Sequence, residues 1–282
     1  MRKGAIVLGT FDGLHKGHMA VLGLANEYSP KTVITFDFPP AMDERKELLM
    51  LPGEKNEELE GLGFSIETLD FSKVRSIPAE EFLHQMDEKY HPEAICCGFN
   101  YRFGYCGKGG VDTIKAFCSA RGIKVLIADA VSAADVRISS SFIRELIKCG
   151  EMEKANGMLS APFSVSGEVS HGDSRGRTMG TPTVNFFYPE GLVAARHGVY
   201  AACALVDGRE YAAVSYIGNR PTFHLERCIC ETNLLDFSGN LYGKRLKISL
   251  LSFLREDKQF SSLDELKKQI QSDILNAKKH LS

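Results

Sequence analysis

Two histidines, His15 and His18, stand three residues apart at the end of a glycine-rich stretch that runs from Gly9 to His18 with the sequence GTFDGLHKGH. An apolar run at residues 5–8 precedes this stretch and predicts a buried parallel strand. Apolar residues follow at helical spacing, namely Ala20, Val21, Leu24 and Ala25. The unpaired N–H groups at a helix N-terminus suit a phosphate, and glycines let the backbone approach a ligand closely. We therefore predict a nucleotide phosphate site, in which both imidazoles donate hydrogen bonds to charge that grows in a transition state.

Each part of this stretch also has a simpler interpretation. Asp12-Gly13 is a common turn pair, and a lone histidine usually has a structural role. The H-x-x-H spacing is also compatible with half of a metal site. The combination of strand, glycine turn and paired histidines at the start of an α/β pattern favours phosphate binding, with Gly9 and Phe11 as parts of the same loop.

A second stretch with chemical potential lies at residues 171–185, HGDSRGRTMGTPTVN. Its glycines, including Gly172 and Gly180, and its basic residues Arg175 and Arg177 could cradle a polyphosphate. Thr183 and Asn185 are two residues apart, so on a strand they face the same side. Two such oxygen ligands, with nucleotide phosphates and water, are a usual Mg²⁺ arrangement. Taken alone, a glycine- and serine-containing loop followed by a strand is more often a plain loop than a binding site.

A third candidate is the stretch Arg137-Ile-Ser-Ser-Ser-Phe-Ile-Arg144. Its serines, Ser140 and Ser141 among them, can cap the helix that follows, which would explain one of the hydroxyl groups. Three hydroxyl groups between two arginines also indicate a polyphosphate clamp.

Composition limits the class of protein. A chain of 282 residues with 44% hydrophobic and 25% charged residues is compatible with two globular domains. The net charge of −2 gives no electrostatic footprint for nucleic acid. We expect neither a signal peptide nor a membrane span, because no apolar run is long enough. The eight cysteines form no C-x-x-C pair, so we expect reduced thiols and a cytoplasmic protein rather than zinc or disulfides.

The first half of the chain alternates between predicted strands and helices. Apolar runs predict strands at residues 33–36, 94–97 and 125–127, and helices begin near residues 78 and 111. Residues 43–60 are expected to be an exposed helix or loop. This alternation predicts an α/β fold with a parallel sheet that binds ligands at the carboxyl ends of its strands. His15, Asn100 and the loop after Ile127 would converge there.

The pattern changes after residue 162. Residues 163–169 alternate as a strand does, and Asp207-Gly208 joins two strand-like runs as a hairpin. Residues 230–237 and 244–251 are expected to pair around Ser238-Gly239-Asn240. These features predict an antiparallel barrel or sandwich. It is followed by a capping box at residues 262–265 and a terminal helix with one apolar face, Leu263, Leu266, Ile270, Ile274 and Ala277. We place the domain boundary near residue 160, giving domains 1–159 and 160–282.

Several motifs resemble known families. The stretch G-x-F-D-G-x-H-x-G-H resembles the nucleotidyltransferase superfamily, and G-R-x-x-G-x-P-T-x-N, at residues 176–185, resembles the riboflavin kinase signature. Residues 217–223, 231–237 and 241–244 match the same kinase family in order. From about residue 4 to the last helix, the chain therefore resembles the bacterial bifunctional riboflavin kinase/FAD synthetases.

This resemblance implies two domains and two activities. A Rossmann-like nucleotidyltransferase domain would transfer AMP from ATP to FMN, and a β-barrel domain would phosphorylate riboflavin with ATP. The resemblance assigns Glu231 as the general base of the kinase step, and Thr183 and Asn185 as ligands of Mg²⁺ with ATP. It assigns phosphate or nucleotide contacts in the first domain to His15, His18, Asn100, Ser140, Ser141 and Arg144. The expected partners are small molecules: riboflavin, FMN and ATP.

The chain departs from the family pattern at a few positions. Ser141 stands where threonine is usual, Val184 replaces alanine, and Thr181 replaces phenylalanine. Residues 35–40, TFDFPP, lack the histidine of the usual T-F-x-P-H-P, which bears on adenylylation and not on the kinase step. Two other interpretations stay open: another small nucleotidyltransferase with an accessory β domain, and a flavin-binding regulator without turnover. The second would be expected to lose His15, His18 or Glu231, all of which are present.

Overall fold

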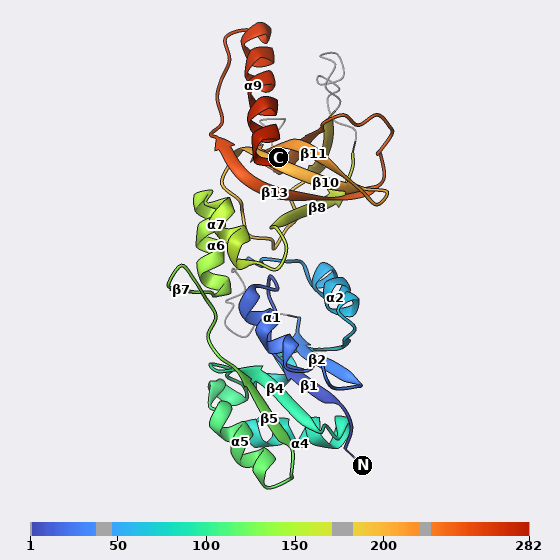
Figure 1. Ribbon diagram of the computed structural model, residues 1–282, viewed down its shortest axis with the longest axis vertical. Coiled ribbons are helices and arrows are strands. Elements are labelled where there is room, and N and C mark those ends of the chain that lie inside the picture. Colours follow the sequence, from blue (N-terminus) through green and yellow to red (C-terminus); the bar gives the residue numbers. More distant parts are fainter. Residues whose placement is uncertain (1, 38–46, 171–182, 220–226, 282) are drawn as a thin grey trace. The chain divides into compact units, whose positions relative to one another are not determined.

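The computed structural model describes residues 2–37, 47–170, 183–219 and 227–281 (Figure 1). The chain divides into two compact units, Met1–Ser140 and Ser141–Ser282.

The first unit contains a five-stranded parallel sheet with the strand order β3-β2-β1-β4-β5. Its strands are β1 (Ala5–Leu8), β2 (Lys31–Phe36), β3 (Ser65–Leu69), β4 (Ala94–Gly98) and β5 (Lys124–Ala128). This sheet confirms the predicted α/β fold. The edge strand β3 was not predicted, because its sequence SIETL has no apolar run and none of its residues is fully buried.

Helices cover both faces of this sheet, and each face has its own core. Alternate residues of β1 separate the two cores: Ala5 and Val7 lie in one and Ile6 and Leu8 in the other, as expected for a strand buried on both faces. The first core includes residues of α1 (Lys16–Gly23) and α2 (Pro52–Gly61). The second includes residues of α4 (Ala79–Tyr90) and α5 (Val111–Ser119), which lie together on one side of the sheet (Figure 1).

The remaining elements of this unit are short: α3 (Phe71–Val74), the 3₁₀ turn η1 (Tyr105–Gly107), and the ribbon of β6 (Ser132–Ala133) and β7 (Val136–Arg137). The expectation of an exposed helix or loop at residues 43–60 was correct for the helix α2 and its exposed residues, such as Glu57, Glu58 and Glu60, but wrong for its inner face. Glu54, Lys55 and Leu59 of that helix are buried, and residues 43–46 lie outside the described part of the chain.

The second unit contains a six-stranded antiparallel sheet with the strand order β8-β13-β10-β11-β12-β9. Its strands are β8 (Ser164–Glu168), β9 (Thr183–Phe187), β10 (Gly198–Val206), β11 (Arg209–Asn219), β12 (Cys228–Leu234) and β13 (Arg245–Arg255). An antiparallel bridge between Ser170 and Asn185 brings the two edge strands together, with the Ser170 amide donating to the Asn185 carbonyl at 2.8 Å. The sheet therefore forms a nearly closed barrel, as predicted.

One predicted hairpin formed and another did not. Val206 pairs with Arg209 around the turn Asp207-Gly208, in which both residues have positive φ angles of 50° and 80°. By contrast, β12 and β13 do not pair with each other. Strand β12 pairs with β11 and β9, whereas β13 pairs with β10 and β8. The expected pairing of residues 230–237 with 244–251 was wrong, because the long strands β10 and β11 lie between them in the sheet.

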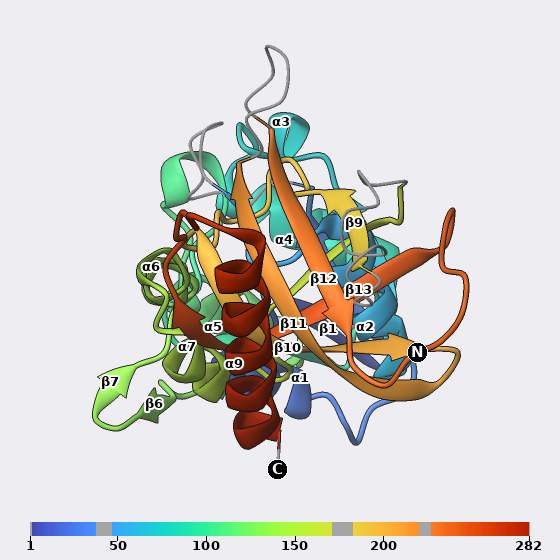
Figure 2. The same cartoon turned by 90° about the horizontal axis from the view of Figure 1, so that it is seen from above.

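Among the described residues, the helices that belong to this unit in whole or in large part are α6 (Ser140–Cys149), α7 (Met152–Met158) and α9 (Leu263–Leu281). Figure 2 shows α9 lying along β10 and β11. Its Asp273 is 3% exposed and accepts hydrogen bonds from the Arg255 guanidinium, the shortest at 2.8 Å, which ties the helix to β13. The predicted apolar face is only partly buried, since Ala277 is fully buried but Leu263, at the first turn, is 69% exposed.

The Ser262 hydroxyl accepts a hydrogen bond from the Glu265 amide at 3.2 Å, as the predicted capping box requires. The second half of the box is absent, because the Glu265 carboxylate accepts hydrogen bonds from the amide and hydroxyl of Ser261 and not from the Ser262 amide. All eight cysteines are free thiols. Within the described residues, no helix is both long and apolar enough to cross a membrane.

Candidate functional site

The glycine-rich loop leaves the end of β1 in a strained conformation. Phe11 and Leu14 have positive φ angles of 54° and 43°, which residues other than glycine seldom adopt. Gly13 has a φ of 83°, and a Cβ atom there would come within 2.7 Å of the Leu49 side chain. At Gly9, a Cβ atom would lie 2.8 Å from the ring of Phe11. The glycines thus permit close packing around the loop, and strain of this kind is common at functional sites.

His15 and His18 lie where α1 begins. His15 is the N-cap residue, and its Nδ1 accepts the backbone amide of His18 at 3.2 Å. The two rings stack with centroids 3.6 Å apart, and the buried Phe11 ring packs edge-on against His18 at 5.4 Å. The structure therefore brings the predicted pair together, with Phe11 as a packing partner.

Both imidazoles are held neutral in this environment. Burial lowers the pKa of His15 to about 4. The pKa of His18 lies well below its usual range, because burial disfavours the charged ring and because a positive charge on His18 would be repelled by a protonated His15 and by Lys55. A neutral His15 whose Nδ1 accepts a hydrogen bond must carry its proton on Nε2. The arrangement can therefore offer an N–H donor to an anion at the positive end of the α1 dipole.

Hydrogen bonds to Thr35, Leu49 and Lys55 hold the glycine-rich loop in place. The Thr35 hydroxyl donates to the Thr10 carbonyl at 3.0 Å, and Asp12 Oδ1 accepts the Leu49 amide at 2.8 Å. Lys55 Nζ lies 2.9 Å from Thr35 Oγ1 and donates to two backbone carbonyls. Lys55 was not among the residues predicted for this site. Its position one helical turn before the buried Leu59 was the available signal, since residues four apart share a helix face.

The remaining predicted residues of this site are spread over several elements. Ser140, the last residue of the first unit, donates its hydroxyl to the Asp12 carbonyl of the loop at 3.1 Å. Asn100 follows β4 and is exposed, and Arg137 is exposed on β7. Ser141 and Arg144 belong to the second unit, on α6, with Ser141 exposed and Arg144 half-buried.

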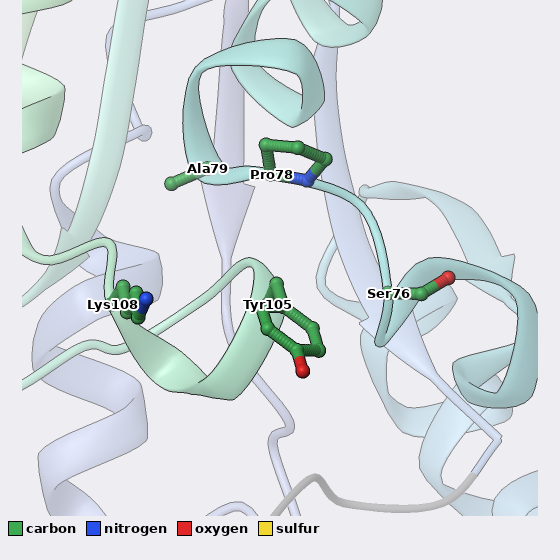
Figure 3. Close-up of a pocket in the computed structure, with 5 residues that line it drawn as sticks. All are labelled: Ser76, Pro78, Ala79, Tyr105 and Lys108. Atoms are coloured by element: carbon green, nitrogen blue, oxygen red, sulfur yellow. The ribbon is translucent and has the colours of Figure 1, made fainter.

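A pocket of about 330 Å³ lies near the loop that follows β4, lined by Ser76, Pro78, Ala79, Tyr105 and Lys108 (Figure 3). Tyr105 is 53% exposed, and Lys108 Nζ lies 6.0 Å from its ring centroid. The sequence analysis singled out none of these residues. The pocket offers an aromatic side chain and an ammonium group at the N-terminal end of α4.

In the second unit, Thr183, Asn185 and Glu231 form one hydrogen-bonded cluster. Glu231 of β12 pairs in register with Asn185 of β9, and the Thr183 hydroxyl donates to Glu231 Oε1 at 3.1 Å. Asn185 Nδ2 donates to the same hydroxyl at 3.3 Å. The neighbours of Glu231 on the other face of β12, Cys230 and Thr232, are fully buried, whereas Glu231 is half-buried.

This donor set fits a hard cation. A hydroxyl, an amide and a carboxylate, all from adjacent strands, supply the oxygen ligands that Mg²⁺ prefers. Within the described residues, no group of three or more histidine, cysteine or acidic side chains could hold a metal on its own. Nucleotide phosphates and water are the ligands that usually complete the coordination of Mg²⁺ at such a site. The other predicted residues of this site, Gly172, Arg175, Arg177 and Gly180, lie outside the described residues.

These features define a chain with a nucleotidyltransferase-like unit and a β-barrel unit of the riboflavin kinase type. The FAD synthetase family profile matches residues 1–142, and the riboflavin kinase profile matches residues 159–281. The chain belongs to the family of bifunctional riboflavin kinase/FMN adenylyltransferases.

Individual relatives cover nearly the whole chain. Bifunctional riboflavin kinase/FMN adenylyltransferases from Bacillus subtilis and Escherichia coli K12 are each 32% identical. The alignments cover 99% and 97% of this chain, and 93% and 91% of those proteins. A solved structure from Streptococcus pneumoniae, of a protein named a macrolide-efflux protein, is 30% identical, with a TM-score of 0.88 over 98% of this chain and 94% of that one. The match shows that both units of the present chain have the fold of the corresponding parts of that structure.

Proposed function

We propose that the two activities of this family are carried out here by two separate sets of residues. The riboflavin kinase domain phosphorylates riboflavin to FMN, and the FAD synthetase domain transfers AMP from ATP to FMN with release of pyrophosphate. We assign the kinase step to the Thr183–Asn185–Glu231 cluster and the adenylyl transfer to the loop that carries His15 and His18.

In the kinase step, Glu231 acts as the general base. The ribityl hydroxyl of riboflavin is neutral, so a carboxylate that accepts its proton assists attack on the γ-phosphorus of ATP. Thr183 and Asn185 would hold Mg²⁺ together with ATP. The bound ion would neutralise charge on the phosphates. Gly172, Arg175, Arg177 and Gly180 are assigned to the same polyphosphate on the strength of sequence alone.

In adenylyl transfer, the nucleophile needs no base. The FMN phosphate is already an anion, so the site has to position it and stabilise the charge that develops on the α-phosphoryl group and the leaving pyrophosphate. His15 and His18 supply hydrogen bonds beside the N-terminus of α1. We assign supporting nucleotide or phosphate contacts to Gly9, Phe11, Asn100, Arg137, Ser140, Ser141 and Arg144.

We also propose a cytoplasmic enzyme whose partners are small molecules and not nucleic acid. The eight free thiols and the net charge of −2 support this proposal. As functional domains we propose residues 1–159 and 160–282.

The observation that carries the proposal is the hydrogen-bonded cluster of Thr183, Asn185 and Glu231, because it joins three predicted residues from two strands in one place. Incubation with riboflavin and Mg-ATP, followed by chromatography, should yield FMN and then FAD. FMN with Mg-ATP should yield FAD directly. A nucleotidyltransferase with an accessory β domain would form no FMN, and a flavin-binding regulator would form neither product.

A further inference from the structure

Helix α2 carries a buried ammonium group beneath the glycine-rich loop. Lys55 is 6% exposed, and its Nζ lies 2.9 Å from Thr35 Oγ1, 3.3 Å from the Phe36 carbonyl and 3.4 Å from the Thr10 carbonyl. Thr10 belongs to the loop, and Phe36 is the last residue of β2. The ammonium therefore joins the loop to the carboxyl end of the neighbouring strand.

Burying a positive charge costs desolvation free energy, so an ammonium group is an unfavourable choice for joining the loop to β2. Among the residues that the structure describes, all three oxygen partners are uncharged, so no carboxylate there offsets the desolvation of the ammonium by direct contact. Burial lowers the pKa of Lys55, while the charges of Asp12 and Asp37 at longer range favour its protonated form. An apolar or amide side chain would fill the same space without this cost. The charge itself thus calls for an explanation.

The groups around Lys55 give a reason for the buried charge. Its charge acts on His18, the ring stacked on His15 at the start of α1. It lies on the core side of the loop that we assign to phosphate binding. A positive charge in a poorly solvated position acts on a nearby anion more strongly than one in water.

We propose that Lys55 is a positioning residue for adenylyl transfer, whose ammonium fixes the Thr10 backbone and adds positive potential beneath the phosphate site. This inference rests on the proposed function of the loop. In the reaction, an FMN phosphate oxygen forms a bond to the α-phosphorus of ATP. The bond from that phosphorus to the bridging oxygen breaks, and pyrophosphate leaves with the electron pair. Lys55 keeps its proton throughout and favours the negative charge that moves onto the leaving group.

Three variants of the full-length chain separate the charge from the hydrogen bonds. Lys55→Gln keeps a donor but loses the charge, and Lys55→Arg keeps the charge. Lys31→Gln is the matched control, because Lys31 lies at the other end of β2 and donates to the Leu62 carbonyl just beyond α2 at 3.0 Å. The riboflavin kinase activity of the same molecules reports whether each variant is intact.

We expect Lys55→Gln to lower kcat for FAD formation from FMN by about tenfold to a hundredfold, less than the loss of a direct transition-state donor. Lys55→Arg and Lys31→Gln should stay close to wild type, and riboflavin kinase activity should not change in any variant. The charge on Lys55 opposes protonation of His18, with His15 as the other basic group against that ring. The acid limb of the adenylylation pH profile should therefore move to higher pH in Lys55→Gln.

Wild-type FAD formation in Lys55→Gln overturns the inference and leaves the proposed function standing. A reduced rate with an unmoved pH profile and no rescue in Lys55→Arg overturns it as well, because the role is then only structural. If Lys55→Gln does not fold, Lys55→Arg decides alone: a folded but inactive Arg variant overturns the role of the charge. A wild-type chain that makes FMN but no FAD overturns the inference and the assignment of the loop together.

Discussion

Glu231 Oε1 accepts a hydrogen bond from the Thr183 hydroxyl at 3.1 Å, across the paired strands β12 and β9. This contact places a carboxylate beside two oxygen-bearing side chains that fit Mg²⁺. A base and a metal-phosphate site so close together can serve one phosphoryl transfer.

Replacing Glu231 with glutamine should therefore abolish most kinase activity. The amide keeps the size of the side chain and can still accept from Thr183, but it cannot take the riboflavin proton. General-base catalysis is worth roughly 10²–10⁴ in rate, so FMN formation should fall by that order. Riboflavin should still bind, and FMN supplied directly should still be converted to FAD. Near wild-type kinase turnover in this variant would return Glu231 to a structural role.

His18→Ala should act on the other activity alone. Loss of one transition-state donor typically costs roughly 10²–10³ in rate, so FAD formation from FMN should fall by about that order. FMN formation from riboflavin should persist, because the described kinase residues Thr183, Asn185 and Glu231 all belong to the second unit. An equal loss of both activities in a folded variant would argue for one shared site.

The buried histidines should make the first unit sensitive to acid. An unfolded chain protonates histidine near its ordinary pKa of about 6.5, whereas folded His15 resists protonation until about pH 4. Between these values the unfolded state binds more protons, so the free energy of unfolding should decrease as the pH falls.

The matched variant for this effect is His15→Asn, because asparagine is a good N-cap residue and does not titrate. Urea unfolding of both proteins at several pH values should show a wild-type stability that falls, relative to the variant, by about 3 kcal/mol between pH 6.5 and 4. Parallel stability curves for the two proteins would show that His15 is not held neutral by the fold.

The fragment 160–282 should fold and phosphorylate riboflavin, but the fragment 141–282 should be more stable. Helix α7 packs on β13, and Asn156 Nδ2 donates to the Leu250 carbonyl at 2.8 Å while its Oδ1 accepts the Phe163 amide. Met152 and Met158 are buried, and burial of a methionine contributes about 1.5–3 kcal/mol each. Urea unfolding should therefore show a difference of about 3–6 kcal/mol. A folded but inert fragment would mean that the kinase site uses residues of the first half.

The sequence alone was sufficient for the features that depend on neighbours along the chain. The apolar run of β1, the spacing of His15 and His18, and the turn at Asp207-Gly208 are local patterns, and all appear as predicted. The Thr183–Asn185 pair was also found from its spacing, because residues two apart share one face of a strand. Assignment of Glu231 required the resemblance to a family, since an isolated glutamate on a strand has no local signature.

Tertiary structure decided which strands became neighbours and which polar side chains were buried. Strand β13 pairs with β8 and β10 and not with β12. The edge strand β3 has no apolar run from which a strand could be predicted. Lys55 sits in a charged stretch of sequence, yet the fold buries its ammonium under the glycine-rich loop. Pairing and burial depend on contacts between residues far apart in the chain, and each strand edge can be used only once. Local pattern therefore identified most of the strands and most of the candidate chemical groups, and only the folded arrangement determined their partners and revealed β3 and the buried Lys55.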